Sequence, residues 1–460
     1  MKTISNGTIA PGSGRLPDKL RQLHSLLKRA PLALKPRGPA AEEPGGPIAY
    51  LAGIATAGNL VSLILQFGSG LLVARLLTPG DLGRFNSLIL ITTYSIIVQA
   101  GIINGLNREL PYYLGRGSRE TALALSSTAL GWGILCGAVA GSLSLAWSAR
   151  QLYLGNGQLA AGGAALTVVV ACSFPKLYLQ ATMRTASEFA RLAACQAVVS
   201  VCSLCLVILV WQLKYYGLCA RTVVSGIIEL SLLWWWRPLK VMPRLQLSRW
   251  LHLFRIGAPI FALGYLDNGW ARLDSVMILR KLGTTQLGFY QLSAITLSVG
   301  VTATAAFGSV LYPRMAQTYG RTGDPWEAYR IALRPMALLG AVATPLMVLG
   351  WFLIPVVVSA VLPQYRAGVH AAQWTLVTVY VSCFHIGGDI FTVIRRQDVY
   401  LALLLAGIAI FWCAATWFNS AKDPLAGISQ AMALSRGLFV FMANCTAVYV
   451  TRKGRAALAQ

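Results

Sequence analysis

The sequence predicts an all-α membrane protein with about twelve transmembrane helices, arranged as two parallel six-helix repeats around a central cavity. Three observations predict this fold class: long apolar stretches, basic residues gathered in alternate loops, and a similarity between the two halves of the chain. Only 12% of the 460 residues are charged, whereas soluble domains carry about 25%. Uncharged stretches of about 18 residues or more are long enough to cross a bilayer as helices.

Apolar runs separated by charged breaks define the expected spans. They cover residues 48–76, 83–105, 122–147, 160–183, 190–211, 217–236, 253–280, 284–311, 328–353, 368–394, 398–418 and 424–450. The run Trp234, Trp235 and Trp236 ends the sixth span and is typical of an aromatic anchor at the membrane interface.

The loop charges predict which side of the membrane is cytoplasmic. If the N-terminus is cytoplasmic, the inside segments hold 26 of the 39 Lys and Arg residues, the outside segments hold 9, and 4 lie within spans. Loops rich in Lys and Arg stay in the cytoplasm. We therefore expect both termini to be cytoplasmic.

The spans and loops predict five segments. They are a basic cytoplasmic tail over 1–46, a first lobe over 47–236, a basic cytoplasmic linker over 237–252, a second lobe over 253–450 and a cytoplasmic tail over 451–460. In the first tail, four leucines share one helical face among basic residues: Leu16, Leu20, Leu23 and Leu27. This pattern fits a short helix on the membrane surface, and an unstructured basic tail is the alternative.

The chain resembles itself at an offset of 205 residues. Arg75 corresponds to Arg280, and Gly83 corresponds to Gly288. One helix later Gly115 still corresponds to Gly320 without a gap. The alternative is a chance similarity between two hydrophobic hairpins. A duplication with an even number of spans in each half gives parallel repeats, and repeat transporters place their binding site between the repeats.

Neither nucleic-acid binding nor catalysis is indicated by the sequence. The net charge is +24, but the basic residues lie in short loops rather than on one soluble domain. No Walker, G-x-S-x-G or H-E-x-x-H motif occurs, so we predict no enzyme and no catalytic residues. The nine cysteines lie in or beside apolar segments, and the C-x-x-C at Cys202 and Cys205 has no second pair nearby, so we predict no metal site.

Charged and polar side chains within the spans are the candidate functional residues, because charges inside a bilayer are costly without a wet cavity or a partner. The candidates for substrate binding are Arg436, Arg272, Lys176, His385, Gln99 and Asn104. The candidates for coupling to a proton or sodium ion are the carboxylates Asp389, Asp274, Asp267 and Glu229. Ion pairing between helices is the alternative for each charge, for example Arg272 with Asp274 or Arg436 with Asp389.

Two spans at equivalent places in the halves are rich in polar side chains. The second span carries Gln99, Asn104 and Asn107, and the eighth carries Ser293, Thr296, Ser298, Thr302, Thr304 and Ser309. We expect these spans to wall a hydrophilic cavity. Guanidinium groups bind phosphate oxygens in a bidentate way, so the arginines favour an anionic ligand.

Several motifs resemble one known family. The run from Ala74 to Phe85 (ARLLTPGDLGRF), the run Gly105–Leu110, Gly257-Ala258-Pro259 and Leu287-Gly288-Phe289-Tyr290 are similar to oligosaccharide flippases. These are O-antigen translocases of the multidrug/oligosaccharidyl-lipid/polysaccharide exporter superfamily. The resemblance covers roughly residues 48 to 395. Its motifs are degenerate and identify the superfamily better than the cargo.

The resemblance implies a bacterial inner-membrane transporter for cell-surface polysaccharide synthesis. It would move an undecaprenyl-pyrophosphate-linked oligosaccharide from the cytoplasmic to the periplasmic leaflet by alternating access, with no cofactor apart from a coupling proton or sodium ion. Its partners would be the lipid-linked oligosaccharide, the bilayer, and a polysaccharide polymerase or glycosyltransferases. The alternatives are a cation-coupled multidrug exporter of the same superfamily and a non-transporting assembly factor.

Overall fold

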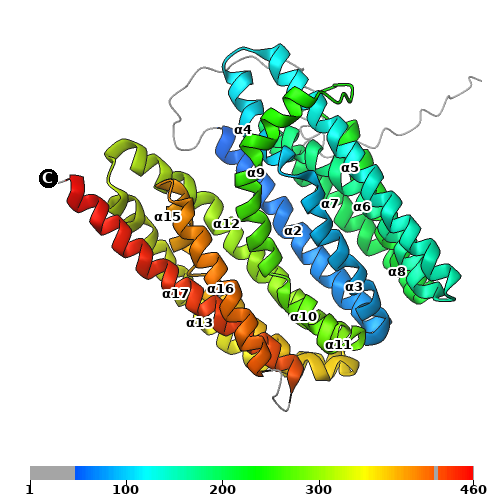
Figure 1. The fold of residues 1–460 in the computed structure, drawn as a ribbon. Helices are drawn as coiled ribbons and strands as arrows, with labels where there is room; N and C mark the ends of the chain where they lie inside the picture. The colour runs from blue at the N-terminus through cyan, green and yellow to red at the C-terminus, as the bar shows by residue number, and fades with distance from the viewer. Residues whose placement is uncertain (1–46, 419–422, 459–460) are drawn as a thin grey trace, which may run out of the picture. The chain divides into compact units, whose positions relative to one another are not determined.

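The computed structural model describes residues 47–418 and 423–458, and every regular element within them is a helix (Figure 1). The predicted basic tail at 1–46 lies outside the described residues. The first half, residues 47–236, contains α2 (Pro47–Leu76), α3 (Pro79–Ser95), η1 (Ile96–Gln99), α4 (Ile102–Gly115), α5 (Arg119–Tyr153), α6 (Gly157–Thr185), α7 (Phe189–Cys205) and α8 (Val207–Trp235). The second half contains α9 (Leu247–Trp270), α10 (Leu273–Lys281), α11 (Thr284–Phe289), α12 (Gln291–Thr322), α13 (Pro325–Val361), η2 (Pro363–Gly368), α14 (Val369–Ser382), α15 (Ile386–Val393), α16 (Gln397–Phe418) and α17 (Pro424–Leu458).

The helices follow the predicted order of membrane passes. By length and composition, six helices in the described part of the chain could cross a membrane: α5, α6, α8, α13, α16 and α17. The pair α3–α4, bent by 53°, would be a seventh. The other expected passes are α2, α7, α9–α10, α11–α12 and α14–α15, of which α7 is shorter and the three pairs are interrupted. Counting each interrupted pair once gives twelve passes over the described residues, which agrees with the predicted all-α fold.

Three of the interruptions occur at residues with unusual backbone angles. Ala100 (φ 52°) and Gly101 (φ 78°) separate η1 from α4 in a left-handed turn. Lys214 (φ 51°, ψ −121°) interrupts α8, so the fifth pass ends just before it and the sixth begins just after it. Arg272 (φ −120°, ψ 2°) separates α9 from α10. Each break exposes backbone groups that a continuous helix would pair internally.

Side chains and prolines define where two long passes begin. Thr78 caps α3 by accepting a hydrogen bond from the Asp81 backbone N–H at 3.2 Å, and Pro79 follows at the first helical position. Asp324 caps α13 by accepting from the Trp326 backbone N–H at 2.8 Å, and Pro325 follows. Proline suits this position because its missing N–H would be unpaired there in any case.

The duplicated halves meet each other through equivalent residues at α3 and α11. Gly83 and Gly288, which the offset relates, pack helix to helix: a Cβ on Gly83 would lie 2.8 Å from the Gly288 backbone nitrogen. One turn further, the Asn86 Nδ2 donates to the Gln291 Oε1 at 2.7 Å, and these two residues are also 205 apart. A contact between equivalent positions is what an axis relating two parallel repeats requires.

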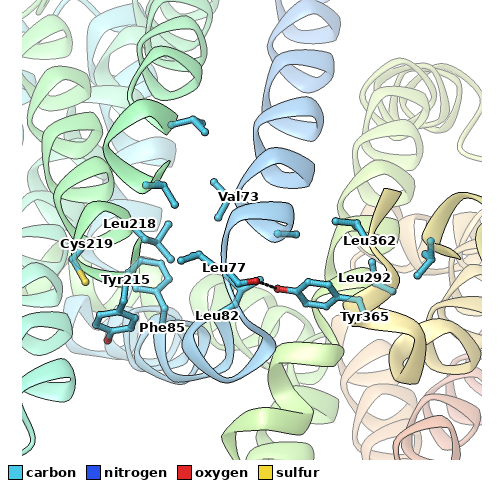
Figure 2. Close-up of a cluster of buried hydrophobic side chains, with 14 of the residues drawn as sticks. Val73, Leu77, Leu82, Phe85, Tyr215, Leu218, Cys219, Leu292, Leu362 and Tyr365 are labelled. Carbon is cyan, nitrogen blue, oxygen red and sulfur yellow. Dashed lines mark hydrogen bonds between the residues drawn. The ribbon is translucent and has the colours of Figure 1, made fainter. Parts of the chain in front are cut away.

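Apolar side chains from both halves bury each other beside this contact, at the end of the bundle predicted to be periplasmic (Figure 2). The labelled members of the cluster are Val73, Leu77, Leu82, Phe85, Tyr215, Leu218, Cys219, Leu292, Leu362 and Tyr365. The Tyr365 hydroxyl donates to the Leu77 carbonyl at 3.2 Å, drawn as the dashed line in Figure 2. This end of the interface is therefore closed by apolar packing and by backbone hydrogen bonding.

At the opposite end the halves are not equivalent. Helix α9 packs closely along α4 of the first half, where a Cβ on Gly101 would lie 2.7 Å from the Gly257 carbonyl carbon. Leu253 is fully buried against the Gly105 backbone in the same seam. The corresponding contact between α2 and α12 is slight. Among the described residues, the seam between α4 and α9 thus has no equally close counterpart between α2 and α12.

Two predicted segment boundaries differ from the helices. Helix α9 begins at Leu247, inside the predicted linker 237–252, because its first turns pack on the first half through the buried Leu253. Helix α17 continues to Leu458 and includes most of the predicted tail 451–460. The described helices belong to one unit, so the division into two lobes stays a prediction.

Candidate functional site

A cavity of about 350 Å³ lies between α2, α3, α10 and α12, and we call it the axis cavity. Its walls consist largely of residues that the 205-residue offset relates. The pairs are Phe67 and Arg272, Gly70 and Ser275, Asn86 and Gln291, Ile89 and Ala294, Leu90 and Ile295, and Thr93 and Ser298. The cavity therefore lies where the two repeats meet. Asn86, Thr93, Gln291 and Ser298 of the second and eighth spans line it. Of the polar residues predicted to wall the cavity, only Ser298 is among the lining residues that the structure describes.

Arg272 is the charged residue of the axis cavity. It occupies the break between α9 and α10, and its side chain is exposed. The neighbouring Asp274 carboxylate instead accepts from the Tyr290 hydroxyl at 2.5 Å and from the Ser275 hydroxyl at 3.1 Å. In the described part of the chain Arg272 makes no salt bridge, and the alternative pairing with Asp274 is not formed. Its guanidinium is available to a ligand.

A second cavity of about 330 Å³ lies within the second half, and we call it the second-half cavity. Its charged and amide, hydroxyl or imidazole side chains include residues from α9, α10, α14, α15 and α17 and from the turn before α15: Asp267, Asn268, Asp274, Thr375, Thr378, Ser382, His385, Asp389 and Arg436. Tyr290 lines both cavities. Tyr290 and its hydrogen bond to Asp274 therefore lie where the two cavities adjoin.

The charges of the second-half cavity are partly paired. The Arg436 Nη1 lies 3.2 Å from the Asp267 Oδ1, and its guanidinium lies 3.8 Å from the centre of the Trp270 ring. The partner of Arg436 is thus Asp267 rather than Asp389. Asp389 has no hydrogen-bond or ion-pair partner among the described residues. Asp389 therefore lines the cavity without a cation partner in the described part of the chain, whereas Asp274, the third carboxylate, is held by the Tyr290 and Ser275 hydroxyls.

His385 contributes an unpaired nitrogen to the same cavity. Its Nε2 lies 3.3 Å from the Tyr400 hydroxyl, and its Nδ1 is buried without a partner. The imidazole also stacks on Phe439, with ring centres 5.3 Å apart. These contacts hold the ring in place beside Asp389, one helical turn further along the chain.

The remaining candidate residues line neither cavity. The Lys176 Nζ lies 2.7 Å from the Glu229 Oε2 in a pair between α6 and α8, with 19% and 15% of their side chains exposed. Gln99 is buried in η1 with its Oε1 unpartnered, and Asn104 lies in α4. The structure thus brings six of the ten candidates to the two cavities, and the roles of all ten stay predictions.

Sequence reasoning missed several polar residues of the cavities. Asn86 and Gln291 line the axis cavity, and Asn268 and Tyr290 line the second-half cavity. The self-comparison could have found the first two, because the offset aligns one amide side chain with another. Tyr290 belongs to the motif Leu287–Tyr290 that carries the family resemblance, but the motif does not indicate that its side chain lines a cavity. Nothing in the local sequence around Asn268 distinguishes it from other polar residues near a span.

Comparison with known proteins supports the fold and provides a family. A family model described as "Polysaccharide biosynthesis protein" matches residues 72–366, which is more than half of the chain. No curated protein sequence matches the chain significantly.

Solved structures with the same fold are transporters. The chain is similar to an inward-facing multidrug resistance MATE family transporter of the MOP superfamily, with 12% identity, 86% of this chain and 96% of that chain covered, and a TM-score of 0.73. An outward-facing form of such a transporter matches with 14% identity, coverages of 89% and 96%, and a TM-score of 0.64. A MOP superfamily transporter from Pyrococcus furiosus Vc1, described as having a binding pocket of reverse polarity, matches with 12% identity, coverages of 89% and 96%, and a TM-score of 0.62.

Proposed function

Because this chain belongs to the polysaccharide biosynthesis protein family, we propose that it is a transporter that flips an undecaprenyl-pyrophosphate-linked oligosaccharide from the cytoplasmic to the periplasmic leaflet. The observation that carries this proposal is the unpaired Arg272 in the cavity between the repeats. The pyrophosphate and sugars would cross within the protein while the lipid chain stays in the bilayer.

The axis cavity suits a pyrophosphate group for two reasons. A guanidinium binds two phosphate oxygens at once through parallel N–H donors. Arg272 also directly precedes the first turn of α10, where unpaired backbone N–H groups and the helix dipole favour an anion. The amides of Asn86 and Gln291 keep N–H donors for phosphate or sugar oxygens. The Thr93 and Ser275 hydroxyls donate to the Ile89 carbonyl and the Asp274 carboxylate, so their oxygens can accept from sugar hydroxyls.

A cation-coupled multidrug exporter is the second candidate function. The observation that favours it is the excess of carboxylates in the second-half cavity, since Asp389 and Asp274 face Arg436 in addition to its partner Asp267. The structures named above as multidrug transporters share the fold. A cationic drug would, however, be repelled by Arg272 at the interface of the repeats. A non-transporting assembly factor would need neither the Arg272 guanidinium nor the carboxylates of the second-half cavity.

The same proposal includes the location of the protein, its partners and the driving force for transport. The protein would lie in the bacterial inner membrane with both termini in the cytoplasm, beside a polymerase or glycosyltransferases of polysaccharide synthesis. Transport would be driven by a proton or sodium gradient, with Asp389 and Asp274 as the first carboxylates to test.

The test is a complementation experiment in which variants are expressed in a deletion strain and the lipid-linked glycan is measured. The gene is deleted, and the lipid-linked glycan that accumulates is identified by mass spectrometry. We expect wild type and Arg280→Ala to clear this glycan, because Arg280 is exposed and lines neither cavity. Loss of a charged hydrogen bond weakens binding by roughly tenfold or more, so we expect Arg272→Ala to leave the glycan uncleared and Arg272→Lys to restore clearance in part. Clearance by Arg272→Ala at wild-type protein levels would refute the assignment, and no accumulation in the deletion strain would refute the function.

A further inference from the structure

We propose that the second-half cavity binds the sugar next to the pyrophosphate and selects a sugar rich in hydroxyl, amide or amino donors over one that carries a carboxylate. This inference rests on the proposed function and adds the class of sugar that the protein accepts.

The two cavities are neighbours along the ligand. Tyr290 lines both, and Arg272 lies on the α9–α10 break with Ala271 on the second-half side and Ser275 on the axis side. A pyrophosphate bound at Arg272 therefore places its first sugar beside the wall formed by Tyr290 and Asp274. The volume of about 330 Å³ falls in the range of small-molecule sites and exceeds what a single ion needs.

The polar lining of this cavity consists mainly of hydrogen-bond acceptors. The Thr378 and Ser382 hydroxyls donate to backbone carbonyls of their own helix at 3.2 and 2.8 Å. Their hydrogens are therefore used, and their oxygens can only accept from a ligand. The Asp389 carboxylate, which has no partner in the described part of the chain, is a further acceptor. A ligand that satisfies such a lining must bring donors, as the O–H and N–H groups of sugars do.

The same lining disfavours acidic sugars. Arg436, the cation of this cavity, is held by Asp267 at 3.2 Å and stacked on Trp270. A uronic acid would bring its carboxylate beside Asp389 with no free cation to offset the two charges. Like charges in a site of low dielectric repel strongly, so this contact costs binding free energy.

The test compares two lipid probes that differ in one group. Protein in lipid nanodiscs is titrated with undecaprenyl pyrophosphate, with its glucose conjugate and with its glucuronic acid conjugate, and Kd is measured for each. We expect the wild type to bind the glucose probe at least about tenfold more tightly than the glucuronic acid probe. Asp389→Asn should tighten binding of the glucuronic acid probe and so narrow this ratio to about threefold or less.

The expected gain in affinity separates this effect from misfolding, which would weaken both probes. Asp398→Asn is the matched control, because Asp398 is exposed at the start of α16 and lines neither cavity. Equal wild-type affinity for the two sugar probes, or an unchanged ratio in Asp389→Asn, would overturn the inference. Arg272→Ala should weaken all three probes; if the bare pyrophosphate lipid binds equally well to Arg272→Ala, the proposed function fails instead. Binding of none of the probes by the wild type overturns both.

Discussion

The contact between Gly83 and Gly288 leaves no room for a side chain, and this makes it a sensitive place to perturb the interface of the repeats. A Cβ on Gly288 would overlap the Pro79 carbonyl, and a Cβ on Gly83 would overlap the Thr284 carbonyl. In both cases the obstacle is helix backbone, which cannot rotate away as a side chain can. Relief requires α3 and α11 to move apart.

We therefore predict that Gly288→Ala shifts the protein toward a state in which these helix ends are separated. Overpacking a tight contact costs roughly 1–3 kcal/mol. Because about 1.4 kcal/mol changes an equilibrium constant tenfold, the closed state should lose roughly 5- to 150-fold in population relative to the open state. The open state escapes this cost but gives up the hydrogen bond between Asn86 and Gln291 and that between Tyr365 and Leu77.

Disulfide cross-linking between Asn86→Cys and Gln291→Cys reports the closed state, since these side chains are within hydrogen-bonding distance of each other at 2.7 Å. We expect the rate of cross-linking under mild oxidation to fall several-fold when Gly288→Ala is added. Each single-cysteine variant shows the background from the nine native cysteines. Peptide mapping by mass spectrometry identifies the bond.

Gly80→Ala is the control, because it adds the same methyl group to α3, the helix against which Gly288 packs. Its Cβ would meet its nearest neighbour only at 3.9 Å, an ordinary contact distance. Cross-linking should therefore stay near the rate of the parent. Equal rates in Gly288→Ala and Gly80→Ala would refute the reasoning that backbone contact at this glycine holds the two ends together.

Two further predictions concern stability and are checked by thermal unfolding of the purified protein in detergent. Lys176→Met should cost up to about 3–5 kcal/mol because it leaves the largely buried Glu229 carboxylate without a cation and with only the Gln180 amide at 3.4 Å, and adding Glu229→Gln should recover most of that loss; an equal loss in the single and double variants would show that the ion pair is not the cause. Asp324→Ala removes the cap of α13 and should cost about 1 kcal/mol, and Glu327→Ala, one turn further on, should cost less. Unchanged thermal stability of Asp324→Ala would mean that water replaces the capping hydrogen bond.

The repeat is the part of the fold that sequence patterns predict best. The offset rests on local similarity, and the structure places the related Asn86 and Gln291 in contact. The positions of the helix breaks could not be predicted from the repeat. Lys214 and Arg272 leave helical geometry without a proline or glycine at the position, because surrounding packing rather than local propensity decides their backbone angles.

The site was predictable as an inventory of residues and not as an arrangement. Six of the ten candidate residues line the two cavities, but the partner of Arg436 is 169 residues away at Asp267. Which of several carboxylates meets a given arginine depends on the rotation and tilt of each helix. The hydrophobic pattern of a span does not fix its rotation and tilt closely enough to choose between Asp267 and Asp389.

The seam between α4 and α9 has a mechanical consequence. Helix α9 is attached to the first half through Gly257 and Leu253, whereas α10 packs mainly against α11 and α17 of the second half. The seventh pass is therefore held by the first half near Gly257 and by the second half from Asp267 onward, where Asp267 pairs with Arg436 and Trp270 is buried. Any rotation of one half against the other would bend the pass between these two regions. A ligand held by Arg272 would then lie just beyond the bending stretch, on the side that moves with the second half.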